Sequence, residues 1–135
     1  MQNPPNDGTK QSASRMNGAF PSTPHAPSPE SVSAPPSPDT YLREAIEMAV
    51  QNVTTGQGGP FAALVVEDDE IIGRGTNVVT TLNDPTAHAE VTAIRRACDA
   101  QNDFELTGCT LYATCEPCPM CLGAAYWARL DRVYY

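Results

Sequence analysis

Residues 114–123 read TCEPCPMCLG and residues 83–95 read NDPTAHAEVTAIR, and these two stretches decide how the sequence is interpreted. In the first, Cys118 and Cys121 stand three residues apart at the predicted start of a helix, so both sulfurs point to one side of it. In the second, His88 stands at the predicted start of another helix. Free backbone N–H groups and the positive end of the helix dipole favour a thiolate at such positions. We therefore predict a zinc site held by this histidine and the two cysteines.

A set of three protein ligands is typical of a catalytic zinc ion. Structural zinc sites are closed by four protein ligands, whereas catalytic sites leave one position to water. Zinc lowers the pKa of that water towards neutrality, and the resulting hydroxide needs a proton carrier beside it. Glu90 follows His88 by two residues on the same predicted helical turn. We expect Glu90 to take the water proton and pass it to the substrate.

Two other interpretations of the cysteines stay open from the residues alone. Cys118 and Cys121 could form a redox pair at a helix start, although that leaves the histidine and the glutamate without a role. Alternatively, Cys115 or Cys109 could complete a structural zinc site, at a spacing that is not standard. The cysteines number five, which is odd, and the N-terminus lacks the apolar core of a secretory signal. Both features argue against a disulfide framework.

Hydrophobic periodicity around these motifs predicts the element order α-β-β-α-β-α-β. Ser37 and Pro38 are typical of the N-cap and the first position of a helix. The apolar positions of this helix are Leu42, Ala45, Ile46, Ala49, Val50 and Val53. Residues 67–70 are too charged for anything but a hairpin turn, and residues 76–86 read as a loop. The other predicted elements are strands at 61–66, 71–74, 110–113 and 130–135, a helix from Thr86 or Ala87, and a helix at 118–129 whose apolar positions include Met120, Leu122, Ala125 and Trp127.

Residues 1–38 differ in composition from the rest of the chain. They hold nine of the 13 prolines and only isolated large apolar residues. Such a segment cannot bury enough apolar surface to offset the entropy of ordering its backbone. We expect a disordered Pro/Ser-rich tail, with a docking or phosphorylation segment as the alternative. A single domain is then expected at 39–135.

The chain is acidic, with 16 acidic and 8 basic residues and a net charge of -8. An acidic domain is a poor electrostatic partner for nucleic acid or for an anionic membrane surface. No apolar run reaches the ~18 residues of a membrane span. We therefore expect a cytoplasmic protein that acts on a small molecule, with no membrane partner and with nucleic acid disfavoured.

His88-x-Glu90 together with Pro117-Cys118-x-x-Cys121 resembles the signature of the zinc-dependent cytidine deaminase-like superfamily. The resemblance covers residues 40–135, including the element order. It implies a three-layer α-β-α fold with a mixed sheet and one zinc ion per chain. It also implies hydrolytic deamination by zinc-bound hydroxide, with Glu90 delivering protons to a ring nitrogen and to the leaving ammonia.

The residues that flank both motifs, 83–95, 114–124 and 126–129, look like the purine and guanine deaminase branch. The tRNA adenosine deaminases are close relatives, but they typically carry Leu at the position of Cys115 and are usually more basic. The resemblance therefore implies deamination of guanine to xanthine and ammonia. The alternatives are deamination of tRNA adenosine, cytosine or a nucleoside, or an inactive fragment that binds zinc without turnover.

The same resemblance implies several contacts with a purine base. Asn77 would bind the base edge, although it could also be a turn asparagine. The backbone N–H of Ala89 would hold a ring carbonyl. Phe61 would stack on the base or belong to the core of its strand, and for Trp127 packing in the core is favoured over substrate contact.

Relatives continue with more helix and strand after the strand that begins at Arg132. In the guanine branch, that C-terminal part is similar to a segment exchanged between protomers. The resemblance thus implies a homodimer where this part is present. We expect the fold of this chain to be truncated after its fourth strand, with the domain at 39–135 C-terminally incomplete.

Overall fold

A computed structural model describes residues 35–135. The predicted disordered tail at 1–38 therefore lies, up to residue 34, outside the described residues. The described elements are α1 (Pro38–Thr54), β1 (Ala62–Glu67), β2 (Glu70–Thr76), α2 (Val79–Leu82), α3 (Ala89–Gln101), β3 (Thr110–Ala113), α4 (Pro119–Trp127) and β4 (Arg132–Tyr134). The predicted order is confirmed with one addition, because the short helix α2 lies within the stretch predicted as a loop.

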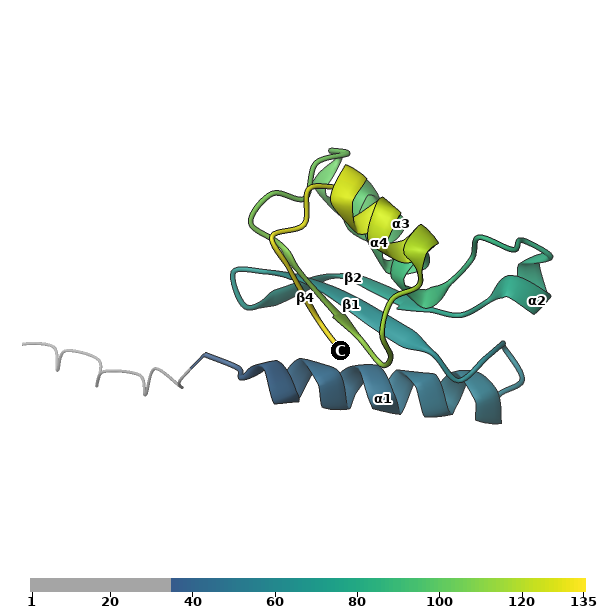
Figure 1. The fold of residues 1–135 in the computed structure, drawn as a ribbon. Helices are drawn as coiled ribbons and strands as arrows, with labels where there is room; N and C mark the ends of the chain where they lie inside the picture. Colours follow the sequence, from purple (N-terminus) through teal and green to yellow (C-terminus); the bar gives the residue numbers. More distant parts are fainter. Residues whose placement is uncertain (1–34) are drawn as a thin grey trace, which may run out of the picture. The chain divides into compact units, whose positions relative to one another are not determined.

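The strands form one mixed sheet in the order β2-β1-β3-β4. β1 is antiparallel to both β2 and β3, and β3 is parallel to β4. α1 covers one face of the sheet, and α3 and α4 cover the other (Figure 1). The predicted three-layer α-β-α architecture with a mixed sheet is confirmed.

The turn between β1 and β2 is the predicted charged hairpin turn. Asp68 and Asp69 have φ of 46° and 66°, so both lie in the left-handed region. Two-residue hairpin loops with positive φ at both positions have the twist that suits antiparallel strands. β2 is longer than predicted and continues to Thr76, which delivers the chain directly to Asn77.

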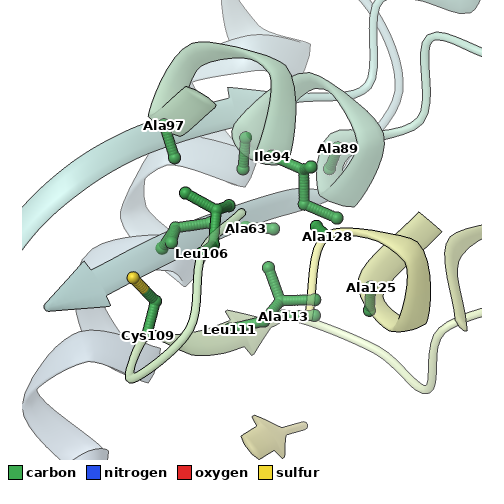
Figure 2. Packing of buried hydrophobic residues seen from close by; sticks show 12 residues of the cluster. Ala63, Ala89, Ile94, Ala97, Leu106, Cys109, Leu111, Ala113, Ala125 and Ala128 are labelled. Carbon is green, nitrogen blue, oxygen red and sulfur yellow. The ribbon is translucent and has the colours of Figure 1, made fainter. Parts of the chain in front are cut away.

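Alternating side chains of β1 build a core on each face of the sheet. Leu64 and Val66 pack toward α1 together with Tyr41, Ala45 and Tyr112. The core on the opposite face lies between the sheet, α3 and α4 (Figure 2) and consists largely of alanine: Ala63, Val65, Ala89, Ala93, Ile94, Ala97, Leu106, Cys109, Leu111, Ala113, Ala125 and Ala128.

Small residues bring α3 unusually close to β2. A Cβ atom placed on Gly73 would lie 2.5 Å from the carbonyl oxygen of Ala93. A Cβ atom on Gly75 would lie 2.1 Å from the carbonyl oxygen of Ala89, at the first residue of the helix. These two glycines therefore let the sheet set the position of the N-terminus of α3.

α1 begins as predicted, with Ser37 as N-cap and Pro38 in the first turn. The face of α1 that packs on the sheet differs from the face predicted from the apolar residues. Its buried residues are Tyr41, Ala45, Ala49 and Asn52. Ile46, Val50 and Val53 are 47–56% exposed and line an apolar groove with Ala49, Thr54, Pro60 and Thr114. Within residues 35–135, α1 and the other helices fall short of the length and apolar character that a membrane crossing requires.

Candidate active site

The structure brings the three predicted zinc ligands together. The Sγ atoms of Cys118 and Cys121 lie 3.5 Å apart, and the Nδ1 atom of His88 lies 3.7 Å from the first and 3.6 Å from the second. Tetrahedral zinc, with Zn–S near 2.3 Å and Zn–N near 2.0–2.1 Å, separates its ligand atoms by about 3.5–3.8 Å. The donor set and its spacing therefore fit one zinc ion.

Both ligand segments stand at helix N-termini, but each helix begins later than predicted. His88 and Cys118 are the N-caps of α3 and α4, with extended backbones. The carbonyl of His88 accepts from the N–H of Thr92, and the carbonyl of Cys118 accepts from the N–H of Leu122. The expected placement of His88 and Cys118 inside their helices is wrong. The N-cap position turns each side chain out of the helix and across its first turn.

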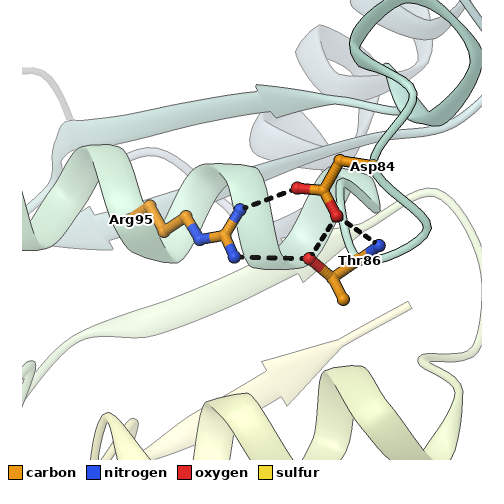
Figure 3. Close-up of polar contacts among 3 residues, drawn as sticks. All are labelled: Asp84, Thr86 and Arg95. Atoms are coloured by element: carbon orange, nitrogen blue, oxygen red, sulfur yellow. Dashed lines mark hydrogen bonds and ion pairs between the residues drawn. The ribbon is translucent and has the colours of Figure 1, made fainter.

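A polar turn before α3 fixes the N-cap (Figure 3). The Oδ1 atom of Asp84 accepts hydrogen bonds from the backbone N–H and the hydroxyl of Thr86, at 2.8 and 2.7 Å. The hydrogen bonds from Thr86 hold the pKa of the Asp84 carboxyl below its usual range. Arg95, two turns along α3, donates to the Thr86 hydroxyl and pairs with Asp84. This turn delays the start of α3 from the expected Thr86 or Ala87 to Ala89.

The two cysteines of the site differ in their electrostatic surroundings. The backbone N–H of Cys121 lowers the pKa of the Cys118 thiol, as expected at a helix N-terminus. Burial raises the pKa of the Cys121 thiol, and the neighbouring Cys118 and Glu90 raise it further. A bound metal cation reverses this second effect, because a coordinating thiol is deprotonated.

The alternative interpretations of the cysteines find no support in the geometry. Among the described residues, the group that could hold a metal ion comprises His88, Cys118 and Cys121 and includes neither Cys109 nor Cys115. The structural zinc site with a fourth cysteine is therefore wrong. A redox pair does not require a histidine nitrogen within 4 Å of both sulfurs, so the metal site explains the arrangement better.

A small cavity of about 140 Å³ opens beside the ligands. Its lining residues are Phe61, Asn77, His88, Glu90, Cys115, Glu116 and Cys118. Glu90 is only 4% exposed, so its carboxyl group is largely excluded from solvent next to the metal ligands. The cavity is smaller than the ~300–1,000 Å³ of pockets for drug-sized ligands, which suits a small planar molecule.

Some of the residues expected to contact a base lie at the cavity, and one does not. Phe61 and Asn77 line the cavity, and Phe61 is 40% exposed. Ala89 is the buried first residue of α3, and the first four N–H groups of a helix have no intrahelical partner. Trp127 is 81% exposed at the end of α4 and lines a different hollow with Tyr126, Arg129 and Leu130. The expectation that Trp127 packs in the core is therefore wrong.

Three residues near the cavity were not predicted to line it or to contact a base. Cys115 and Glu116 line it, and burial raises the pKa of the Cys115 thiol. Asn52 lies behind it, where its side-chain amide donates to the carbonyl oxygens of Gly59 and Asn77. The spacing of Asn52 from Ala45 and Ala49, which puts a polar residue on the buried face of α1, was the available signal.

A three-layer α/β fold with two helix N-termini that present a histidine and two cysteines beside a buried glutamate defines a class of zinc-binding domain. Residues 36–135 match the family described as the cytidine and deoxycytidylate deaminase zinc-binding region. The chain therefore belongs to this family, which confirms the resemblance of its motifs.

The relatives within the family include guanine and tRNA deaminases. Guanine deaminase from Bacillus subtilis is 57% identical over 97 residues, which cover 72% of this chain and 62% of that protein, and its X-ray structure matches with a TM-score of 0.71. The tRNA-specific adenosine deaminase of Aquifex aeolicus is 41% identical over 70% of this chain and 62% of its own length. A variant of NE0047 in complex with 8-azaguanine is 33% identical, covers 72% of this chain and 57% of its own, and has a TM-score of 0.68. This chain spans 62% of the length of the two curated deaminases.

Proposed function

We propose that this protein catalyses the hydrolytic deamination of guanine to xanthine and ammonia. One observation carries the proposal: a single small cavity is lined by two of the metal ligands and also by Glu90 and Asn77. The two ligands are His88 and Cys118. In this reaction the bond between the ring carbon and its amino nitrogen breaks, and a bond from that carbon to a water oxygen forms. The residues required are a proton carrier, groups that recognise the base edge, and a surface for its ring.

Glu90 is the proton carrier of the proposed reaction. Zinc held by His88, Cys118 and Cys121 would acidify a water molecule. Glu90 takes the proton of that water and gives it to a ring nitrogen. It then takes a second proton from the hydroxyl that has added to the ring carbon and gives it to the amino group, which leaves as ammonia. Its position near the N-terminus of α3, two residues after His88, keeps it next to the ligands, and its burial keeps bulk water from competing for the proton.

The remaining cavity residues orient the base. Asn77 offers an amide, which can both donate to and accept from a purine edge. Its Oδ1 atom accepts a long hydrogen bond, at 3.4 Å, from the N–H of Val79 at the start of α2. The N–H of Ala89 binds a ring carbonyl at the helix N-terminus, and Phe61 stacks on the ring face. Trp127, far more exposed, has no part in this arrangement within one copy of the chain.

Guanine is favoured over adenosine in tRNA for two reasons. Identity to guanine deaminase is 57%, against 41% for the tRNA-specific enzyme. The net charge of -8 disfavours a polyanion, whose binding is driven by lysine and arginine contacts with phosphate. Homodimer formation and a cytoplasmic location stay predictions.

A panel of substrates tests the proposal. The protein, reconstituted with zinc, is mixed separately with guanine, adenine, cytosine, cytidine and a tRNA anticodon stem, and released ammonia is measured. We expect release from guanine at least about 100-fold faster than from the others, because a cavity that hydrogen-bonds one base edge leaves buried polar groups unpaired with a different base. Zinc-free protein is the control. Preferred release from the tRNA stem or from cytosine would overturn the assignment.

A further inference from the structure

Asn52 is a buried polar residue that the proposed reaction does not use directly. Its side chain is 5% exposed on the sheet-facing side of α1. The Nδ2 atom donates two hydrogen bonds, at 2.7 Å to the carbonyl oxygen of Gly59 and at 2.8 Å to that of Asn77. Burying an amide costs free energy unless its hydrogen bonds are made, so both bonds matter to the fold around it.

The two carbonyls belong to the two segments that form one side of the cavity. One segment leads from Gly58 to Phe61, and the other follows β2 at Asn77. The backbone N–H of Asn77 donates to the carbonyl oxygen of Phe61 at 3.0 Å. A Cβ atom on Gly58 would lie 2.0 Å from the carbonyl oxygen of Asn77, so the segments touch backbone to backbone.

This close approach places carbonyl groups side by side and requires a donor between them. An asparagine amide nitrogen carries two N–H groups, one for each oxygen. Aspartate has the same shape but would set a carboxylate oxygen against two carbonyl oxygens. An apolar residue would leave both buried carbonyls unpaired, which costs free energy.

We infer that Asn52 is a positioning residue for substrate specificity, which holds Asn77 and Phe61 at the spacing that a purine base requires. The inference rests on the proposed role of Asn77 and Phe61 in base binding. Asn52 lies on α1, whereas the zinc ligands and Glu90 lie at the N-termini of α3 and α4. Its loss therefore affects binding of the base more than the chemical step.

The variant Asn52→Asp, compared with Gln51→Glu, tests this inference. Gln51 is exposed on the same helix, so its replacement makes the same change of charge without touching the segments. For zinc-loaded Asn52→Asp we expect KM for guanine and Kd for 8-azaguanine to rise about tenfold, with kcat changed less than about threefold. In Gln51→Glu, all three constants should stay within about twofold of wild type.

A double-mutant cycle with Asn77→Ala separates positioning from general stability. If Asn52 acts through Asn77, adding Asn52→Asp to Asn77→Ala changes Kd for 8-azaguanine by less than about threefold. A variant with lowered thermal stability but wild-type KM and Kd in its folded, zinc-loaded fraction would overturn the inference, as would additive effects in the cycle.

A measurement without catalysis distinguishes failure of this inference from failure of the proposed function. Amide hydrogen exchange at Asn77 reports its bond to Phe61 directly. Exchange at least about tenfold faster in Asn52→Asp than in Gln51→Glu supports the positioning role even if wild type deaminates no guanine. Equal exchange in both variants would refute that role even if wild type is fully active.

Discussion

Asn52 and Glu90 are the polar or charged side chains that the fold buries within residues 35–135. Both lie at the cavity: Glu90 lines it, and Asn52 ties together the segments on one side of it. Burial of such groups lowers stability unless they are paired, and proteins retain them where function requires it. At the scale of single residues, the buried polar side chains are therefore concentrated around the cavity.

Cys109 gives a pH-dependent stability that can be measured. Burial, with the nearby acidic side chains, raises the pKa of its thiol to about 11. A raised pKa means that the contribution of this group is fully present below the pKa of the unfolded chain, near 8.5, and is lost as pH rises toward 11. We expect the free energy of unfolding in urea to fall by about 2 kcal/mol more between pH 8 and pH 10.5 in wild type than in Cys109→Ala. An equal fall in both proteins would contradict this account.

The sequence supports prediction of ligands better than prediction of substrate contacts. His88, Cys118 and Cys121 could be assigned because metal chemistry restricts both residue type and spacing. Trp127 could not be assigned to the core or to the surface, because the apolar residues of a nine-residue helix do not show which of its faces packs on the sheet. Asn52 was overlooked because its role depends on two carbonyls that come close only in the folded chain.

At the scale of elements, helix starts position the chemistry. The turn of Asp84 and Thr86 ends one residue before His88. His88 is therefore the N-cap of α3 and does not lie within the helix. The sequence predicted both helices but not their first residues, because capping depends on hydrogen bonds that periodicity does not reveal. For α1, the apolar pattern contains two neighbouring stripes, and only the packed structure shows that the one with Ala45 and Ala49 meets the sheet.

The contact of β2 with α3 predicts the effect of Gly75→Ala. The added methyl would lie 2.1 Å from the carbonyl oxygen of Ala89 and 2.4 Å from the nitrogen of Ala93. To relieve this overlap, the N-terminus of α3 must move away from the sheet, and His88 must move with it. We expect a loss of about 1–3 kcal/mol in the free energy of unfolding and at least about tenfold weaker zinc binding, measured by denaturant titration and chelator competition.

Gly123→Ala is the matched control for this substitution. Gly123 lies within α4, and nothing stands within 4 Å of a Cβ atom added there. Alanine in a helix interior is favoured over glycine by about 0.5–1 kcal/mol, so this variant should be as stable as wild type or slightly more so. Wild-type zinc affinity in Gly75→Ala would show that the contact does not position the ligand.

At the scale of the whole molecule, the layers of the described domain follow from local patterns. The sequence predicted an apolar strand at 61–66, a charged hairpin turn at 67–70 and amphipathic helices, and the structure contains each of them, with the strand at Ala62–Glu67 and the turn reduced to Asp68 and Asp69. The order of strands β2-β1-β3-β4 was not predicted, because it depends on pairings between segments that are distant in the sequence.

Length and charge limit the range of functions for the whole chain. The chain spans 62% of the length of Bacillus subtilis guanine deaminase, and within that part it contains the metal ligands and Glu90. The acidic balance and the small cavity both favour a small base over a nucleic acid. The zinc-dependent deamination of guanine that we propose agrees with each of these features.

Substitution of Glu90 by glutamine tests this function most directly. The amide has the shape of the carboxylate but cannot carry protons, so it should leave the fold and the ligands unchanged. We predict that Glu90→Gln keeps one zinc ion per chain by metal analysis and releases ammonia from guanine at least about 100-fold more slowly than wild type. Ammonia release at the wild-type rate by the zinc-loaded variant would contradict the account.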